Sequence, residues 1–182
     1  MKKIFLSLLL IFCTGICTLA LEDWRWTDRQ NISVYIPQGD DKTSLMVKAF
    51  KEWQTKTKNQ FIFKGANTPE DSDIDVVFIE KNLESYCGNI DAMGCAQNYT
   101  ENGKMHSKIY IAKRRPKGLL LSNTQVYAVM RHEIGHSLGL GHSKKYGDIM
   151  FANTNLGIAI HQDIQDNDVR ALFAVYGITW RR

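Results

Sequence analysis

The amino-acid sequence predicts a single α+β domain with about five strands and three helices. Short apolar or alternating segments, typical of strands, are interspersed with longer segments whose apolar residues recur with helical spacing. One strand-like segment, residues 74–79, is almost continuously apolar, as expected of a central strand buried on both faces. The 182 residues suffice for one domain with its own hydrophobic core, and no internal repeat or low-complexity linker divides them.

Residues 1–20 have the composition of a secretory signal peptide, so we expect the folded domain to comprise residues 21–182. Two lysines precede an apolar run over residues 4–16, and Thr18-Leu19-Ala20 is a plausible cleavage site. A retained membrane anchor is the alternative, but the run is shorter than the ~20 residues that a spanning helix needs. We therefore expect an exported protein, secreted or periplasmic, without stable membrane association after cleavage.

The charge balance excludes the usual electrostatic pattern of a nucleic-acid-binding protein. Residues 1–20 hold two of the 23 Lys and Arg residues and none of the 19 Asp and Glu residues, which leaves a net charge of +2 after cleavage. So small an excess predicts no nucleic-acid partner. We expect a monomer.

Cys87 and Cys95 remain after signal cleavage, and we expect them to form a disulfide because exported proteins meet an oxidising environment. The bond would close a short loop and stabilise the fold by about 2–3 kcal/mol. Metal ligation by the two thiolates is the weaker alternative, because no second Cys or His pair lies nearby at zinc spacing. Lipid attachment at Cys13 or Cys17 is disfavoured because a large apolar residue precedes each.

The first strand is predicted at residues 31–36, where apolar residues alternate with polar ones. The first helix is predicted from a cap at Thr43 or Ser44 to about Thr55. Its apolar face, which we expect to be buried, consists of Leu45, Ala49, Phe50 and Trp53.

Four further strands are predicted at residues 60–64, 74–79, within 91–100, and at 108–112. An acidic run precedes and enters the strand at 74–79. Its members are Glu70, Asp71, Asp73 and Asp75. These carboxylates could bind Ca²⁺, but we favour a solvated loop because a complete ligand loop with its glycine is absent from the sequence.

The second helix is predicted from a cap at Ser122 or Asn123 to about Leu138, and the third over residues 162–176 or 164–176. Their buried apolar residues are expected to be Val126, Met130, Ile134, Val169, Leu172, Phe173 and Tyr176.

The second helix carries the pattern H-E-x-x-H-x-x-G-x-x-H. His132 and His136 are four residues apart, so their side chains lie on one helix face. Gly139 can adopt the left-handed conformation that ends a helix, and the chain can then return His142 towards the other two. Three imidazole nitrogens with one open position are typical of a catalytic zinc site rather than a closed structural one. Glu133 can reach a water in the open position without being a ligand.

Chance explains this pattern poorly. Average residue usage gives the full pattern on the order of once in 10⁵ chains of this length. The interpretation of these histidines as ordinary polar helix residues is therefore weak, and we expect one catalytic Zn²⁺.

The sequence resembles the matrixins, the matrix-metalloprotease-like branch of the metzincin zinc metallopeptidases, and in its size the small bacterial members. The resemblance covers most of residues 24–177. Besides the zinc pattern, the matching segments are Ala49-Phe50-x-x-Trp53, residues 73–78, His142-Ser143, a Met-turn at residues 148–151, and Asp168 with Leu172 and Tyr176-Gly177 in the closing helix.

The resemblance implies a metzincin-like catalytic domain with a mixed twisted sheet, three helices, and zinc in a cleft between upper and lower subdomains. Met150 would form an apolar floor under the zinc, and Asp168 would support the Met-turn from below. The implied activity is that of a zinc endopeptidase with Glu133 as general base. A polypeptide substrate would lie extended along an edge strand, best placed at residues 93–98, and residues 151–160 would line an apolar pocket beyond the scissile bond.

The sequence departs from the family at several positions. Ala152 replaces a usual proline, and Asn167-Asp168 replaces a usual pair of aspartates. Structural zinc and calcium loops and a pro-segment with a masking cysteine are not recognisable. Tyr146 could support the transition state or simply pack in its loop, and Asp148 is a candidate hydrogen-bond partner for a ligand histidine.

Three alternatives remain at this point. The first is a catalytically silent zinc-containing binding module on the same fold, which is disfavoured because a binder would not need Glu133. The second is an enzyme that uses the same zinc on a non-peptide amide. The third is an exported domain without zinc.

Overall fold

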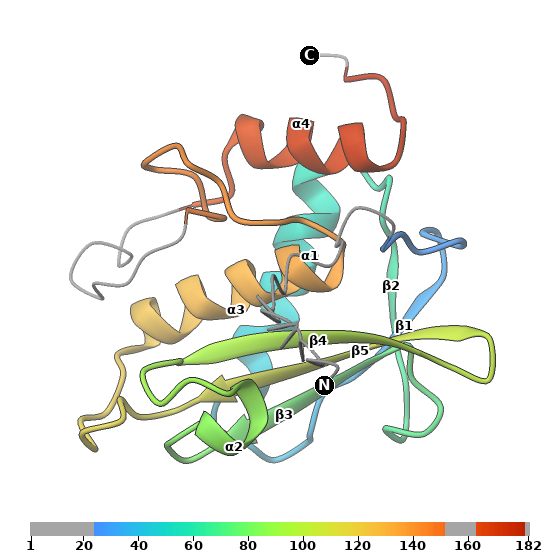
Figure 1. The fold of residues 1–182 in the computed structure, drawn as a ribbon. Helices are drawn as coiled ribbons and strands as arrows, with labels where there is room; N and C mark the ends of the chain where they lie inside the picture. The colour runs from blue at the N-terminus through green and yellow to red at the C-terminus, as the bar shows by residue number, and fades with distance from the viewer. Residues whose placement is uncertain (1–23, 152–162, 181–182) are drawn as a thin grey trace, which may run out of the picture.

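A computed structural model of the chain describes residues 24–151 and 163–180. The predicted signal peptide lies outside the described residues, and so do positions 152–160 of the predicted substrate pocket, with Ala152 among them. The described part is an α+β domain, as the sequence predicted. Figure 1 shows the sheet in the lower part of the molecule and helices beside and above it.

The sheet has five strands in the order β2-β1-β3-β5-β4. The strands are β1 (Ile32–Tyr35), β2 (Phe63–Gly65), β3 (Ile74–Ile79), β4 (Gly94–Glu101) and β5 (Lys104–Ala112). β1, β2, β3 and β5 run parallel to one another, whereas β4 is antiparallel to β5. The sheet is therefore mixed, and β4 is an edge strand.

The bounds of β2, β4 and β5 differ from those predicted. β2 begins at Phe63 because the Ile62 N–H bonds instead to the carbonyl of Arg29, at 2.9 Å. β5 begins at Lys104 rather than at residue 108, and β4 extends to Glu101, just past its predicted range, because Asn102 and Gly103, both with positive φ, connect the two strands by a two-residue turn. An Asn-Gly pair is a recognisable hairpin pattern, so the sequence held this information.

The three long helices are α1 (Thr43–Lys56), α3 (Asn123–Ser137) and α4 (Asp166–Val175). α1 packs against α3, and α3 packs against β4 and β5, so that α3 lies in the middle of the molecule (Figure 1). A fourth, short helix, α2 (Glu84–Cys87), was not predicted. None of the helices in the described ranges is long and apolar enough to cross a membrane.

The start of α1 differs from the prediction of a cap at Thr43 or Ser44. Its N-cap is Lys42, which makes no capping hydrogen bond with its side chain, and the Thr43 hydroxyl donates to the carbonyl of Pro37. Asp40 accepts from the Lys42 N–H at 2.9 Å and so holds the chain before the helix. On the buried face, Met46 takes the place that was predicted for Leu45.

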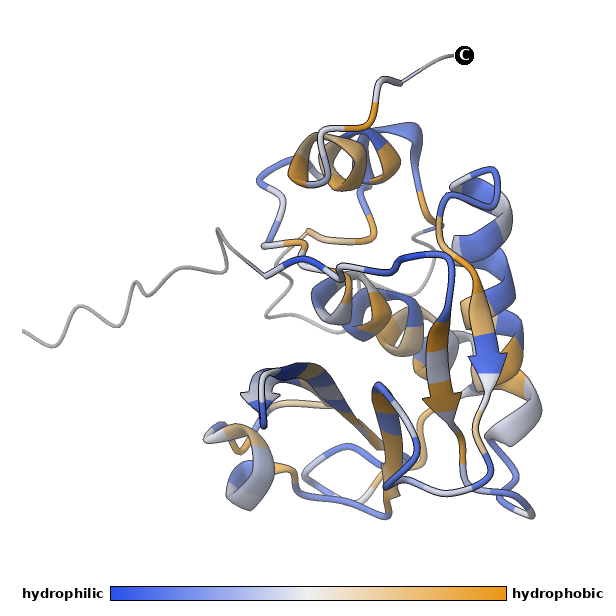
Figure 2. Cartoon of the chain, turned by 90° about the vertical axis from the view of Figure 1, so that its right-hand side faces the viewer, coloured by the Kyte–Doolittle hydropathy of each residue, from blue (hydrophilic) through white to orange (hydrophobic). Residues whose placement is uncertain are grey.

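The hydrophobic core lies between the sheet, α1, α3 and α4. Figure 2 shows apolar segments of the strands and helices turned towards the middle of the molecule and polar segments in the turns. Trp53 of α1 is fully buried, and its indole N–H donates to the carbonyl of Arg131 at 2.8 Å. This bond satisfies a buried donor and fixes α1 to the start of the zinc pattern.

Both ends of α3 are closed by specific contacts. At its start, Ser122 and Gln125 form a reciprocal capping box, as one of the two predicted caps allows. At its end, the indole N–H groups of Trp24 and Trp26 donate to the carbonyl of Ser137 at 3.2 and 2.8 Å. Gly139 follows with φ +95°, and an added Cβ there would lie 2.4 Å from the carbonyl oxygen of Trp24. The helix therefore has to stop where the sequence placed its end.

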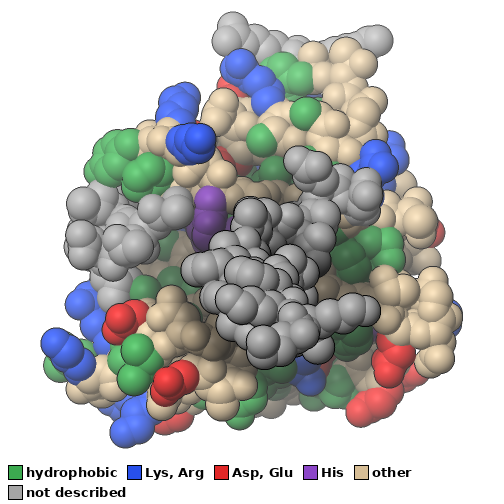
Figure 3. Space-filling view, in the orientation of Figure 1, with side chains coloured by type: hydrophobic (Ala, Val, Ile, Leu, Met, Phe, Trp, Pro, Cys, Tyr) green, Lys and Arg blue, Asp and Glu red, His purple; other side chains and the backbone are tan. Residues whose placement is uncertain are grey.

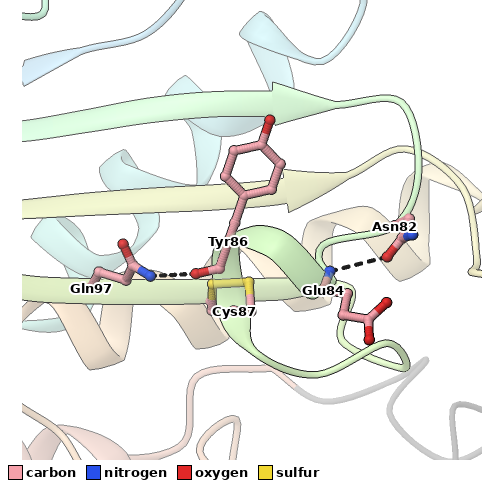
Figure 4. The surroundings of a disulfide bond; sticks show 6 residues. Asn82, Glu84, Tyr86, Cys87 and Gln97 are labelled. Atoms are coloured by element: carbon pink, nitrogen blue, oxygen red, sulfur yellow. Dashed lines mark hydrogen bonds between the residues drawn. A yellow bond between two sulfur atoms is a disulfide. The ribbon is translucent and has the colours of Figure 1, made fainter.

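The predicted disulfide between Cys87 and Cys95 is present and joins α2 to the edge strand β4 (Figure 4). The Gln97 amide donates to the carbonyl of Tyr86 on the same side of the strand. The Tyr86 ring lies 4.8 Å from that of Tyr110 on β5. These contacts fasten the outer face of β4, the strand that the sequence favoured for binding substrate.

The acidic residues before and within β3 make hydrogen bonds and an ion pair with protein groups. These contacts are Thr68 to Asp71 at 2.9 Å, Ser33 to Asp73 at 2.8 Å, and Lys108 to Asp75 at 3.0 Å. The contact of Asp73 joins the loop to β1, and that of Asp75 joins β3 to β5, so these carboxylates have a structural role.

Candidate metal centre and active site

The three histidines of the pattern converge at the end of α3. The Nε2 atom of His136 lies 3.0 Å from that of His132 and 3.2 Å from that of His142. Tetrahedral Zn²⁺ with Zn–N distances of ~2.0–2.1 Å would separate its nitrogen ligands by about 3.3 Å, close to this spacing. Among the described residues, these three form the one cluster of His, Cys, Asp or Glu that could hold a metal ion.

Hydrogen bonds to the other ring nitrogens determine which atoms can bind a metal. Nδ1 of His132 lies 2.7 Å from the carbonyl oxygen of Ile149, and Nδ1 of His136 lies 2.7 Å from that of Leu140. A carbonyl only accepts, so both Nδ1 atoms must carry the proton and both Nε2 atoms present lone pairs. Lone pairs 3.0 Å apart repel each other unless a cation lies between them, so the donor set fits a metal.

Burial keeps these imidazoles neutral. It lowers the pKa of His132 to about 4 and that of His136 to about 3. It also lowers the pKa of His142, which is the most exposed of the three. Neutral imidazole is the form that binds metal, so the fold prepares the ligands before a metal arrives.

Asp148, which the sequence suggested as a partner of a ligand histidine, does not have this role for His132 or His136, whose Nδ1–H groups donate to carbonyls. Instead its carboxylate accepts from the Ser143 hydroxyl and the Asn167 amide, both at 2.6 Å. The prediction was wrong because every residue has a backbone carbonyl, so the sequence does not show which carbonyl accepts from a histidine. Asp148 fixes the residue after His142 rather than a ring.

Glu133 is a residue of α3 whose side chain packs against β4, and it is only 6% exposed. Burial raises the pKa of its carboxyl group to about 8, although a hydrogen bond from the backbone of Ala96 opposes the rise. Gly94 makes room for it, because a Cβ at this position would lie 2.7 Å from Glu133 Cγ and 2.6 Å from Val129 Cγ1. Position 94 therefore has no room for a side chain, a requirement that the sequence analysis missed.

Met150 lies against the helix that carries the histidines. It is 2% exposed, and a Cβ on Gly135 would lie 2.3 Å from its sulfur. Asp168 on α4 accepts from the backbone N–H groups of Ile149 at 3.0 Å and of Met150 at 3.2 Å. This is the contact that the resemblance implied for Asp168, and it ties the Met-turn to α4.

Asn167, a departure from the family pattern, donates to Asp148 where a second aspartate would repel it. Tyr146 is 68% exposed, and its ring lies 5.8 Å from that of Phe151. The ring is mostly exposed rather than packed in its loop, so the role of Tyr146 in the transition state stays a prediction. On the face shown in Figure 3, histidine is visible as one small purple area.

The buried carboxyl of Glu133 gives the metal-free protein a predictable pH dependence. The folded-state pKa of about 8 exceeds the unfolded value of 4.5, so the metal-free fold loses stability as pH rises from 4.5 to 8. Glu133→Gln removes this loss, which amounts to about 3 kcal/mol at pH 7 as an order of magnitude. Urea unfolding in the presence of a chelator should show that the free energy of unfolding of the variant rises relative to that of wild type from pH 4.5 to pH 8.

The exposed Glu84→Gln is the matched control and should show no such gain. A Glu133→Gln difference that stays constant from pH 4.5 to pH 8 would contradict the buried-carboxyl explanation. The histidines change the stability of the metal-free fold in a different pH interval. Because their folded-state pKa values are lowered, the free energy of unfolding decreases as pH falls below 6.5, where the imidazoles of the unfolded chain take up protons.

Comparison with known proteins gives two results. The model of the matrixin family matches residues 25–177. Human neutrophil collagenase (Homo sapiens) is 33% identical over 58 residues, a stretch that covers 32% of this chain and 12% of that protein. The chain thus spans a small part of the collagenase length, and the likeness to it is local. The family match extends from the first described strand to the end of α4 and includes all three histidines. This chain belongs to the matrixin family.

Proposed function

We propose that the protein is an exported zinc-dependent endopeptidase. The observation that carries the proposal is that the Nε2 atoms of His132 and His142 lie 3.0 and 3.2 Å from that of His136, next to the buried carboxyl group of Glu133. Matrixin membership supports zinc as the metal and peptide bonds as the substrate class.

His132, His136 and His142 would hold the zinc through Nε2. Zinc bound there supplies Lewis-acid activation of a water molecule and of the scissile carbonyl. Glu133 accepts the proton of the attacking water and delivers it to the nitrogen of the leaving amine. Its burial favours this role, because a poorly solvated carboxylate is a stronger base than one in water.

The free edge of β4 would bind the substrate as an added strand. The Ala112 N–H bonds to the carbonyl of Met93, so in the alternating antiparallel pattern the odd-numbered residues of β4 face β5. The backbone groups of Gly94, Ala96 and Asn98 then face the open edge, and the Ala96 N–H already bonds to Glu133. A peptide paired with this edge would pass directly by the proposed base.

Export is proposed from the predicted signal peptide together with the disulfide, which persists in oxidising compartments. Detection of the chain in the cytoplasm with residues 1–20 attached would contradict export.

Cleavage-site profiling of the purified protein against a broad peptide library tests the proposed function. We expect internal peptide bonds to be cut by the zinc-loaded protein, no cleavage after chelation, and recovery when zinc is restored. Full zinc occupancy without cleavage of any peptide would favour a silent binding module. Turnover of small amides alone would favour the non-peptide alternative, and unchanged behaviour in chelator would favour a domain without zinc.

A further inference from the structure

Asn98 on the edge strand contacts the ligand helix at a site that the proposed mechanism does not use. Its side-chain Nδ2 donates to the backbone carbonyl of His136 at 2.9 Å. The same carbonyl accepts from the Gly139 N–H at 2.9 Å, in the turn that ends α3. Asn98, a residue of β4, therefore caps a carbonyl in the last turn of α3.

The orientation of the Asn98 amide is fixed by a second bond. Its Oδ1 accepts from the hydroxyl of Ser107 at 2.7 Å, and Ser107 is the residue opposite Asn98 on β5, with 1% exposure. A hydroxyl that donates to Oδ1 leaves Nδ2 to point at His136, so the amide cannot flip without losing both bonds. Ser107, Asn98 and His136 thus form a chain of hydrogen bonds from the sheet to a candidate metal ligand.

The contact completes a pattern along the strand. At every second residue β4 meets α3: Gly94 makes room for Glu133, Ala96 donates to Glu133, and Asn98 donates to His136. The backbone of these same residues faces the open edge, where a peptide would pair. The strand that would hold the substrate is therefore held in register with both the proposed base and a metal ligand.

His136 is restrained at its ring as well as at its backbone, because Nδ1 bonds to the carbonyl of Leu140. Without the Asn98 bond, the carbonyl of His136 loses one of its two protein donors, and the last turn can rotate its ring away from His132. Partners that hydrogen-bond the ligating side chain itself commonly change metal affinity by about 10- to 100-fold, and we expect Asn98, which holds the backbone of the ligand, to act at the lower end of this range.

We propose that Asn98 is a positioning residue that sets the ligand geometry of His136 and couples it to the strand on which substrate binds. The inference rests on the proposed function for its effect on turnover, but its effect on metal affinity does not need a substrate. Asn98→Ala should weaken zinc binding by about tenfold and lower kcat more than it changes KM.

Asn98→Asp sharpens the test, because it keeps the size and the Ser107 contact but replaces the donor by an acceptor facing the carbonyl of His136. It should weaken zinc binding at least as much as Asn98→Ala. Ser107→Ala, which removes only the orienting hydroxyl, should give a smaller loss. Gln97→Ala is the matched control, since Gln97 is the neighbouring residue and its amide donates away from α3 to Tyr86.

Zinc affinity is measured by competition with a chromophoric chelator, and melting temperature in excess zinc reports folding separately. Zinc affinities within twofold of wild type for both Asn98 variants would overturn the proposal, and so would an equal loss in Gln97→Ala. If wild type cleaves no peptide, the proposed endopeptidase function fails, yet the order of zinc affinities still decides the role of Asn98.

Discussion

Glu133→Gln is expected to bind one zinc ion as wild type does and to cleave peptides on the order of 10²- to 10⁴-fold more slowly. The three Nε2 donors are untouched, so the metal site should persist. The amide cannot take a proton from the attacking water, so the chemical step should slow while substrate binding is kept. Zinc content and kcat measured on the same preparation check this result.

Glu133→Ala should lose a similar amount of activity and leave a small cavity beside Gly94. Glu84→Gln, an exposed change on α2, should cleave like wild type. If Glu133→Gln retained more than a tenth of the wild-type kcat, another group would have to act as the base. Among the described residues the metal-ligand cluster consists of the three histidines, so such a base would have to come from outside it.

Asp168→Ala should produce the largest loss of stability. Its buried carboxylate accepts from the backbone N–H groups of Ile149, Met150 and Gln165 at 3.0, 3.2 and 2.8 Å. Alanine leaves three donors without their acceptor, and each unsatisfied buried donor costs about 1–3 kcal/mol. We expect a loss of about 3–5 kcal/mol in urea unfolding, with zinc affinity reduced because the carbonyl of Ile149 holds His132.

Asp166→Ala, an exposed change in the same turn of α4, should alter stability by less than about 1 kcal/mol. Equal losses in the two variants would show that a general effect of charge at the helix start, rather than support of the Met-turn, explains the result.

The sequence predicted best those parts of the site that depend on local spacing. His132 and His136 share a helix face because of the helical repeat, and Gly139 ends the helix because of its backbone freedom. The Ser122 cap and the α3 boundaries follow from residues within the same turn. Such features need no knowledge of what lies across the molecule.

The sequence predicted poorly those features that depend on another segment of backbone. The carbonyls of Ile149 and Leu140 orient two histidines, yet every residue has a carbonyl, so sequence reasoning chose Asp148 instead. Asn98 reads as an ordinary residue of an edge strand until the structure places it beside His136. The prediction of the α1 N-cap was wrong for the same reason, because the Thr43 hydroxyl donates to the carbonyl of Pro37 and does not cap the helix.

The contacts at the end of α3 bear on when the domain can become active during its synthesis. Trp24 and Trp26 are made before α3, whereas Tyr176, whose hydroxyl donates to the carbonyl of Leu138 and accepts from the Trp26 N–H, is made well after it. Asp168, which supports the Met-turn, is likewise made after the last histidine. A nascent chain whose three histidines have already been synthesised still lacks Asp168 and Tyr176. If the proposed function holds, hydrolytic activity should therefore appear only once α4 has been synthesised and has docked against α3 and the Met-turn.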